Sequence, residues 1–81
     1  MTDTGIHERI GALVAEEHAL RAKVVAGGLP PEAEQARLRE LEVALDQCWD
    51  LLRQRRALRH AGQDPDEAAV RPAGEVEGYR Q

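Results

Sequence analysis

The chain has 81 residues, a formal net charge of −4 and 32% charged residues, with one tryptophan, one tyrosine and no phenylalanine. This length allows one domain at most, and the composition indicates a surface-rich helical protein rather than a thick globular core. The acidic balance argues against a chain whose whole surface binds nucleic acid.

The sequence also predicts where the protein acts. No apolar run reaches the roughly 18 residues that a membrane span needs. The N-terminal residues lack the basic and apolar regions of a signal peptide. A single cysteine cannot form an internal disulfide. We therefore expect a cytoplasmic protein that does not span a membrane.

The first predicted element is a helix over about residues 3–26. Asp3 or Thr4 is expected to cap its N-terminus, and Gly27 to end it. We expect Glu17 to lean out of the thin apolar row; the alternatives are an ion pair with Arg21 one turn later and a register-fixing role in an oligomer. The row, with steps of three and four, contains Ile6, Ile10, Leu13, Glu17, Leu20 and Val24.

The second predicted element is a helix over about residues 31–61. Pro31 suits a first helical position, and Gly62 is a natural stop. Arginines gather in its last turns, where the helix dipole favours cations. A row with the same helical spacing contains Glu34, Leu38, Leu41, Leu45, Cys48 and Leu52.

The two rows predict how the helices meet. When Ile6 is paired with Leu52, Leu13 with Leu45, and so on, the two residue numbers of every pair add up to the same value. A constant sum means antiparallel helices in contact along their length, and it places Arg55 opposite Asp3. The predicted fold class is therefore all-α: a coiled-coil-like, antiparallel two-helix hairpin over residues 1–61.

Residues 62–81 are predicted to form an irregular C-terminal tail. Asp64-Pro65-Asp66-Glu67 combines a cap, a first-position proline and a capping acid, so we expect a short helical turn near residues 65–70 that Pro72 stops. We expect Gly62 to turn the chain back, so that the tail lies against the end of the hairpin. The alternative is a loose arm in which Tyr79 belongs to a peptide that docks on a partner.

The second predicted helix carries more apolar surface than contact with one other helix requires. Ala44, Leu51 and Leu58 form a second row, and Trp49 flanks the seam. Chains of this size bury little, and four helices close a core that two cannot. The sequence therefore predicts a homodimer with a four-helix arrangement, or a complex with another protein. The alternative is a monomer whose tail covers the extra row.

No catalytic or metal motif is complete. His7-Glu8 begins like a zinc metalloprotease motif, but Gly11 stands where the second histidine is needed. Cys48 should be buried, far from His18. We interpret Glu42, Asp46 and Asp50 as a solvated acidic face, with a hard-cation site as the alternative. The sequence thus predicts no enzyme, no metal ligand, no cofactor and no small-molecule substrate.

The only concentrated basic patch lies at the end of the second predicted helix. Nucleic-acid binding through this patch is the alternative to a protein-interaction role. The patch lacks interleaved aromatic residues, and the acids of the tail follow at once, so we expect neutralisation by the tail or by Asp3. The candidate interaction surface combines this patch with the extra apolar residues: Trp49, Leu51, Arg53, Arg55, Arg56, Leu58, Arg59 and Tyr79.

Several blocks resemble a known family. Asp46-Gln47-Cys48-Trp49-Asp50 is the most specific, and Glu16-Glu17-His18, Val70-Arg71-Pro72 and Glu75-Val76-Glu77-Gly78-Tyr79 add to it. Together they are similar to a family of actinobacterial proteins known as domain of unknown function 2630. The resemblance implies a stand-alone cytoplasmic protein with a tail that belongs to the family pattern, and it implies no activity.

Overall fold

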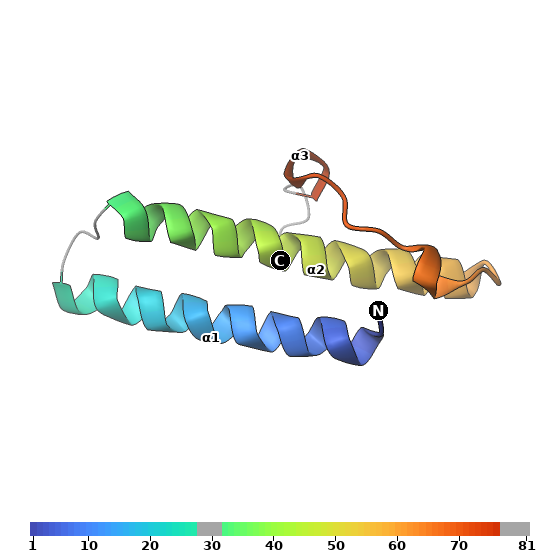
Figure 1. Cartoon of the computed structure of the whole chain (residues 1–81), viewed down its shortest axis with the longest axis horizontal. Helices are drawn as coiled ribbons and strands as arrows, with labels where there is room; N and C mark the ends of the chain where they lie inside the picture. Colours follow the sequence, from blue (N-terminus) through green and yellow to red (C-terminus); the bar gives the residue numbers. More distant parts are fainter. Residues whose placement is uncertain (28–31, 77–81) are drawn as a thin grey trace.

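The computed structural model describes residues 1–27 and 32–76. It contains α1 (Asp3–Gly27), α2 (Glu32–His60), a 3-10 turn η1 (Pro65–Glu67) and the short α3 (Ala73–Val76). α1 and α2 lie side by side and antiparallel, and the tail returns along α2 (Figure 1). The molecule is elongated, with extents of 50 × 24 × 17 Å. The predicted all-α hairpin is confirmed. Within the described residues, no helix is long and apolar enough to cross a membrane.

The cap of α1 differs from the prediction by one or two residues. The Gly5 backbone N–H donates to Thr2 Oγ1 at 3.0 Å, so Thr2 is the N-cap. Asp3 and Thr4 are already helical. The Asp3 carboxylate is held by arginines of α2 and is therefore not the group that caps α1.

The core is a single apolar cluster between the helices. Its buried members are Ile6, Ile10 and Leu13 of α1 and Leu41, Cys48 and Leu51 of α2. Leu41 is fully buried. Leu20, Val24 and Leu38 are only half-buried, so the seam becomes thinner toward residues 27 and 32. Burial is therefore concentrated in the half of the hairpin that the tail also reaches.

Two ion pairs at opposite ends of the hairpin define its register. Arg55 Nε lies 2.5 Å from Asp3 Oδ1, and Lys23 Nζ lies 3.4 Å from Glu34 Oε1. The first pair has the residue-number sum predicted for the seam, and the second differs from it by one. Both agree with the antiparallel pairing deduced from the apolar rows.

α2 ends in a Schellman motif. The Gln63 N–H donates to the Leu58 carbonyl at 2.8 Å, and the Gly62 N–H donates to the Arg59 carbonyl at 3.1 Å. Gly62 has φ +73°, a left-handed conformation in which a Cβ would be strained. This turn sends the chain back along α2, as the sequence predicted.

The tail contains less helix near residue 65 than predicted, and more after Pro72. The Asp66 N–H donates to Asp64 Oδ1 at 2.9 Å, so the predicted cap forms, but η1 ends at Glu67 because Ala68 is extended. α3 follows Pro72, where the sequence indicated irregular chain. The tail runs opposite to α2, with Ala69 beside Gln54 and the Arg71 carbonyl beside Gln47.

Truncating the central core leucine should destabilise the hairpin strongly. We expect Leu41→Ala to lower the free energy of unfolding by about 2–5 kcal/mol, because it removes apolar contacts and leaves a cavity. Val25 is 86% exposed, and Val25→Ala should cost less than about 0.5 kcal/mol. Urea denaturation followed by circular dichroism measures both. Equal costs for the two variants would contradict the described core.

Candidate functional site

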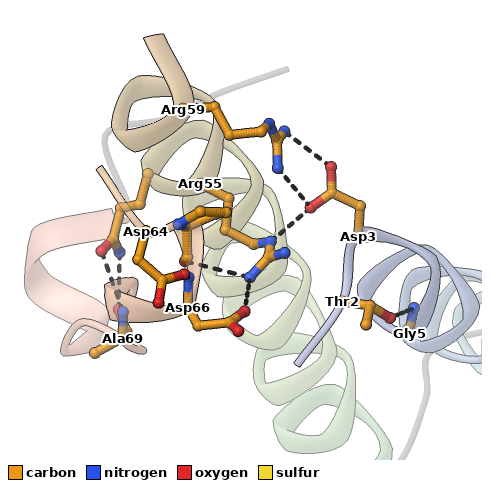
Figure 2. Close-up of polar contacts among 10 residues, drawn as sticks. Thr2, Asp3, Gly5, Arg55, Arg59, Asp64, Asp66 and Ala69 are labelled. Carbon is orange, nitrogen blue, oxygen red and sulfur yellow. Dashed lines mark hydrogen bonds and ion pairs between the residues drawn. The ribbon is translucent and has the colours of Figure 1, made fainter. Parts of the chain in front are cut away.

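Arg55 joins three segments of the chain. Its Nε donates to Asp3 at the start of α1, and its Nη1 donates to Asp66 Oδ1 at 2.9 Å and to the Pro65 carbonyl at 3.2 Å (Figure 2). Arg59 donates to both oxygens of the Asp3 carboxylate. The Arg55 side chain is 8% exposed, so its charge is held by these partners rather than by water.

These contacts change the acidity of the carboxyls involved. Hydrogen bonds from Arg55 and then from Arg59 hold the pKa of Asp3 below its usual 3.8. The Arg55 hydrogen bond likewise lowers the pKa of Asp66. The same two carboxylates raise the pKa of Arg55, which stays protonated. The cluster is therefore a charged network that neutralises Arg55 and Arg59 of the predicted basic patch from within the chain.

A second charged pair holds the tail further along α2. Asp50 is fully buried, and its carboxylate accepts bonds from both ends of the Arg71 guanidinium, with Nε at 2.8 Å. Gln54 Nε2 donates to the same carboxylate at 2.8 Å. The Arg71 hydrogen bond lowers the pKa of Asp50 although burial opposes this shift. The expectation that Asp50 belongs to a solvated acidic face is therefore wrong, because the returning tail covers it.

Two glutamines of α2 bind the backbone of the tail. Gln54 Nε2 donates to the Ala69 carbonyl at 2.8 Å, and its Oε1 accepts from the Ala69 N–H at 3.2 Å. Gln47 Nε2 donates to the Arg71 carbonyl at 3.2 Å. Gln47, Asp50 and Gln54 are spaced three and four apart and lie on one face of α2. The tail is thus held mainly by polar side chains that satisfy an extended backbone.

A cleft of about 310 Å³ lies between α1, α2 and the tail. Cys48 contributes to its lining and is 4% exposed. Burial raises the pKa of the Cys48 thiol, with Arg9 acting in the opposite direction. A thiol in this environment is mostly protonated at neutral pH and is a poor nucleophile. Ile6, Ala44, Leu51 and Val70 give the rest of the cleft an apolar character.

The structure buries some of the predicted interaction residues and leaves others accessible. Leu51 and Arg55 are buried by the chain itself, so the predicted surface does not include them. Leu58 and Trp49 are half-buried, whereas Arg53, Arg56 and Arg59 are exposed. Tyr79 lies outside the described residues. Of the accessible residues, Arg53 and Arg56 share the Trp49 face of α2, whereas Leu58 lies on the opposite face.

Trp49 packs against the core from the flank of the hairpin. Its ring meets His7 of α1 edge to face, with ring centroids 6.2 Å apart and an interplanar angle of 78°. Leu45 and Leu52 lie one turn away on either side and are also half-buried. This flank is an apolar strip whose outer side is left accessible.

Within the described residues, no three His, Cys, Asp or Glu side chains are grouped so that they could hold a metal ion. In the carboxylate row, Asp50 is bound by Arg71 and Glu42 contacts Arg21 at 3.4 Å. Glu17 contacts the same Arg21 at 3.5 Å, which is one of the alternatives that the sequence left open. Two of the three carboxylates of the row, Glu42 and Asp50, are thus engaged by arginines of other segments.

Sequence reasoning missed the residues that hold the tail. Gln47, Asp50 and Gln54 repeat at helical spacing, but this pattern alone is equally typical of a solvated face. Arg71 is an isolated arginine in an irregular segment. The signal lay in the combination of these residues with Arg71. When an extended segment packs on a helix, a carboxylate can bind its arginine and amide side chains can bind its backbone.

Comparison with known proteins agrees with the resemblance found in the sequence. A family model described as "Protein of unknown function (DUF2630)" matches residues 2–81. The chain belongs to this family. Two similar proteins are mycobacterial: "Uncharacterized protein Rv0898c" of Mycobacterium tuberculosis (strain ATCC 25618 / H37Rv) and "Uncharacterized protein Mb0922c" of Mycobacterium bovis (strain ATCC BAA-935 / AF2122/97). Each is 60% identical over 78 residues, covering 96% of this chain and 90% of the relative. No solved structure matches, and no enzyme family is indicated.

Removing the Asp50 carboxylate should release the tail. We expect Asp50→Ala to cost about 1–3 kcal/mol, because Gln54 and Arg71 lose a fully buried acceptor, while the 39% exposed Arg71 side chain can be rehydrated. The amides of Ala69 and Val70 should then exchange with solvent faster than in the wild type. Hydrogen exchange read by NMR measures this change. Glu40→Gln, at a side chain that is 66% exposed, is the control and should change neither quantity.

Acid should weaken the network of Asp3, Asp50 and Asp66. Arginine contacts depress all three pKa values below the usual 3.8, so the ionised form is favoured more in the folded chain than in the unfolded one. This stabilisation is complete above the unfolded pKa and is lost as pH falls below about 3.8 toward the folded values. Urea midpoints should decrease from pH 6 to pH 3, and less so in Asp50→Asn. A midpoint constant down to pH 3 would contradict the network.

Proposed function

We propose that this protein is a non-catalytic, cytoplasmic interaction module that associates with a second copy of itself. The observation that carries the proposal is the apolar strip around Trp49. The tail covers Leu51 and the polar face of α2, but Leu45, Trp49 and Leu52 remain half-buried on the other flank. A tryptophan placed among arginines is a composition typical of interface centres.

The size of the chain supports the same proposal. A hairpin with six buried apolar residues supplies a small core, and small chains gain stability by association. A second hairpin laid against this flank would extend the core into a four-helix arrangement. Binding of another protein through the same strip is the outcome to be separated from self-association.

Contact with nucleic acid receives less support. Arg55 and Arg59 are engaged by Asp3, and Asp66 adds to the neutralisation of Arg55. Arg53 and Arg56 are the exposed remainder of the patch on the Trp49 side. Any binding to DNA or RNA through so few phosphate contacts should be weak and should disappear as salt is raised.

The mass in solution tests the proposal. Light scattering across a dilution series should give a mass near twice 9.0 kDa at high concentration, decreasing toward 9.0 kDa on dilution. Emission from the single tryptophan should shift to shorter wavelength over the same range, because Trp49 becomes further buried. A mass of 9.0 kDa at high micromolar concentration, with constant emission, would refute self-association.

A further inference from the structure

One stripe of α2 carries an ordered set of charges around Trp49. The positions are spaced four and three apart, so they share one face of the helix. Neither α1 nor the tail covers this stripe. Glu42, Arg53 and Arg56 are exposed, and Asp46 and Trp49 are half-buried. In chain order the stripe contains Glu42, Asp46, Trp49, Arg53 and Arg56.

The order of these charges is self-complementary. Glu42 and Arg56 each lie seven residues from Trp49, which is about 10 Å along the helix axis in opposite directions. A two-fold axis at Trp49 would therefore place the acidic half of one stripe on the basic half of another. Parallel packing would instead place acid on acid and arginine on arginine.

We propose that two copies of this chain pack antiparallel through this stripe of α2, with Glu42 of each copy facing Arg56 of the other. The inference rests on the proposed self-association and adds its geometry. An interface of this kind is isologous, because the same patch is used by both copies. Trp49 lies at its centre, where it meets its own symmetry mate.

Contacts within the chain leave this pairing available. Glu42 contacts Arg21 at 3.4 Å, but the two side chains are 49% and 55% exposed, so the carboxylate still reaches outward. Asp46 and Arg53 already have interactions within the chain. The argument is therefore built on Glu42 and Arg56, and the inner pair only adds charge of the same sign to each half.

Charge and apolar area have different roles in this interface. Exposed ion pairs contribute little affinity by themselves, but like charges brought together oppose association. Trp49, Leu45 and Leu52 supply the apolar area that favours binding. The charges select the antiparallel orientation, so changing their signs should have a predictable and reversible effect.

Two single charge reversals test the geometry. Glu42→Arg gives a stripe with arginines at both ends, and Arg56→Glu gives one with acids at both ends. Each variant alone should associate about tenfold or more weakly than the wild type, because identical charges meet. An equimolar mixture of the two should associate like the wild type, because every outer contact is then between opposite charges. Sedimentation velocity measures all of these samples.

A matched control uses the same charge change outside the stripe. Glu40→Arg alters an exposed carboxylate on another side of α2 and should leave association unchanged. The double variant Glu42→Arg/Arg56→Glu should dimerise, because each copy again carries both signs. Circular dichroism of every variant should show the same helical content, which separates loss of association from loss of folding.

The outcomes distinguish this inference from the broader proposal. If the wild type dimerises and both single reversals dimerise equally well, the stripe is not the interface, but self-association stands. If the mixture of reversals does not recover association, the antiparallel pairing is overturned. If the wild type is a monomer at every concentration, self-association fails and this geometry fails with it.

Discussion

The guanidinium of Arg55 is the contact on which the rest of the arrangement depends. It lies on α2 and bonds to a group from each of the other two segments, Asp3 of α1 and Pro65 and Asp66 of the tail. A buried arginine is unfavourable unless its donors are satisfied, so the start of α1 and the residues after Asp64 are required in their observed positions. The hairpin register and the return of the tail are thus coupled through one side chain.

The tail is part of the folded unit although it contributes few apolar groups. Val70 is largely exposed, and among the described tail residues only Ala68 joins the core cluster. The attachment instead depends on Asp50, Gln54 and Gln47, which satisfy a charge and several backbone groups. Such contacts are directional, so they favour one path of the tail over α2. The tail in turn buries Leu51 and leaves the Trp49 flank as the accessible apolar strip.

Periodicity predicted the hairpin because both helices need an apolar row, and two rows of equal spacing determine orientation and register. The turn at Gly62 and the cap at Asp64 were predictable because each depends on a local backbone rule. The burial of Asp50 and Arg55 was not, since a polar residue on a helix is solvated unless a distant segment covers it. The sequence left the burial of Leu51 open between a second copy and the tail, because periodicity does not give the path of a non-helical segment.

The uneven thickness of the seam makes the two ends of the hairpin respond differently to thermal fluctuation. Near residues 27 and 32 the helices are joined by half-buried Leu20, Val24 and Leu38 and by exposed ion pairs such as Arg37–Glu16 and Lys23–Glu34. Exposed pairs of this kind are screened by water and hold the helices together only weakly. Separating the opposite end requires breaking the Arg55 network and exposing Ile6 and Leu51. Local opening should therefore begin at the thin end and propagate inward, while the end that carries the tail remains closed until global unfolding.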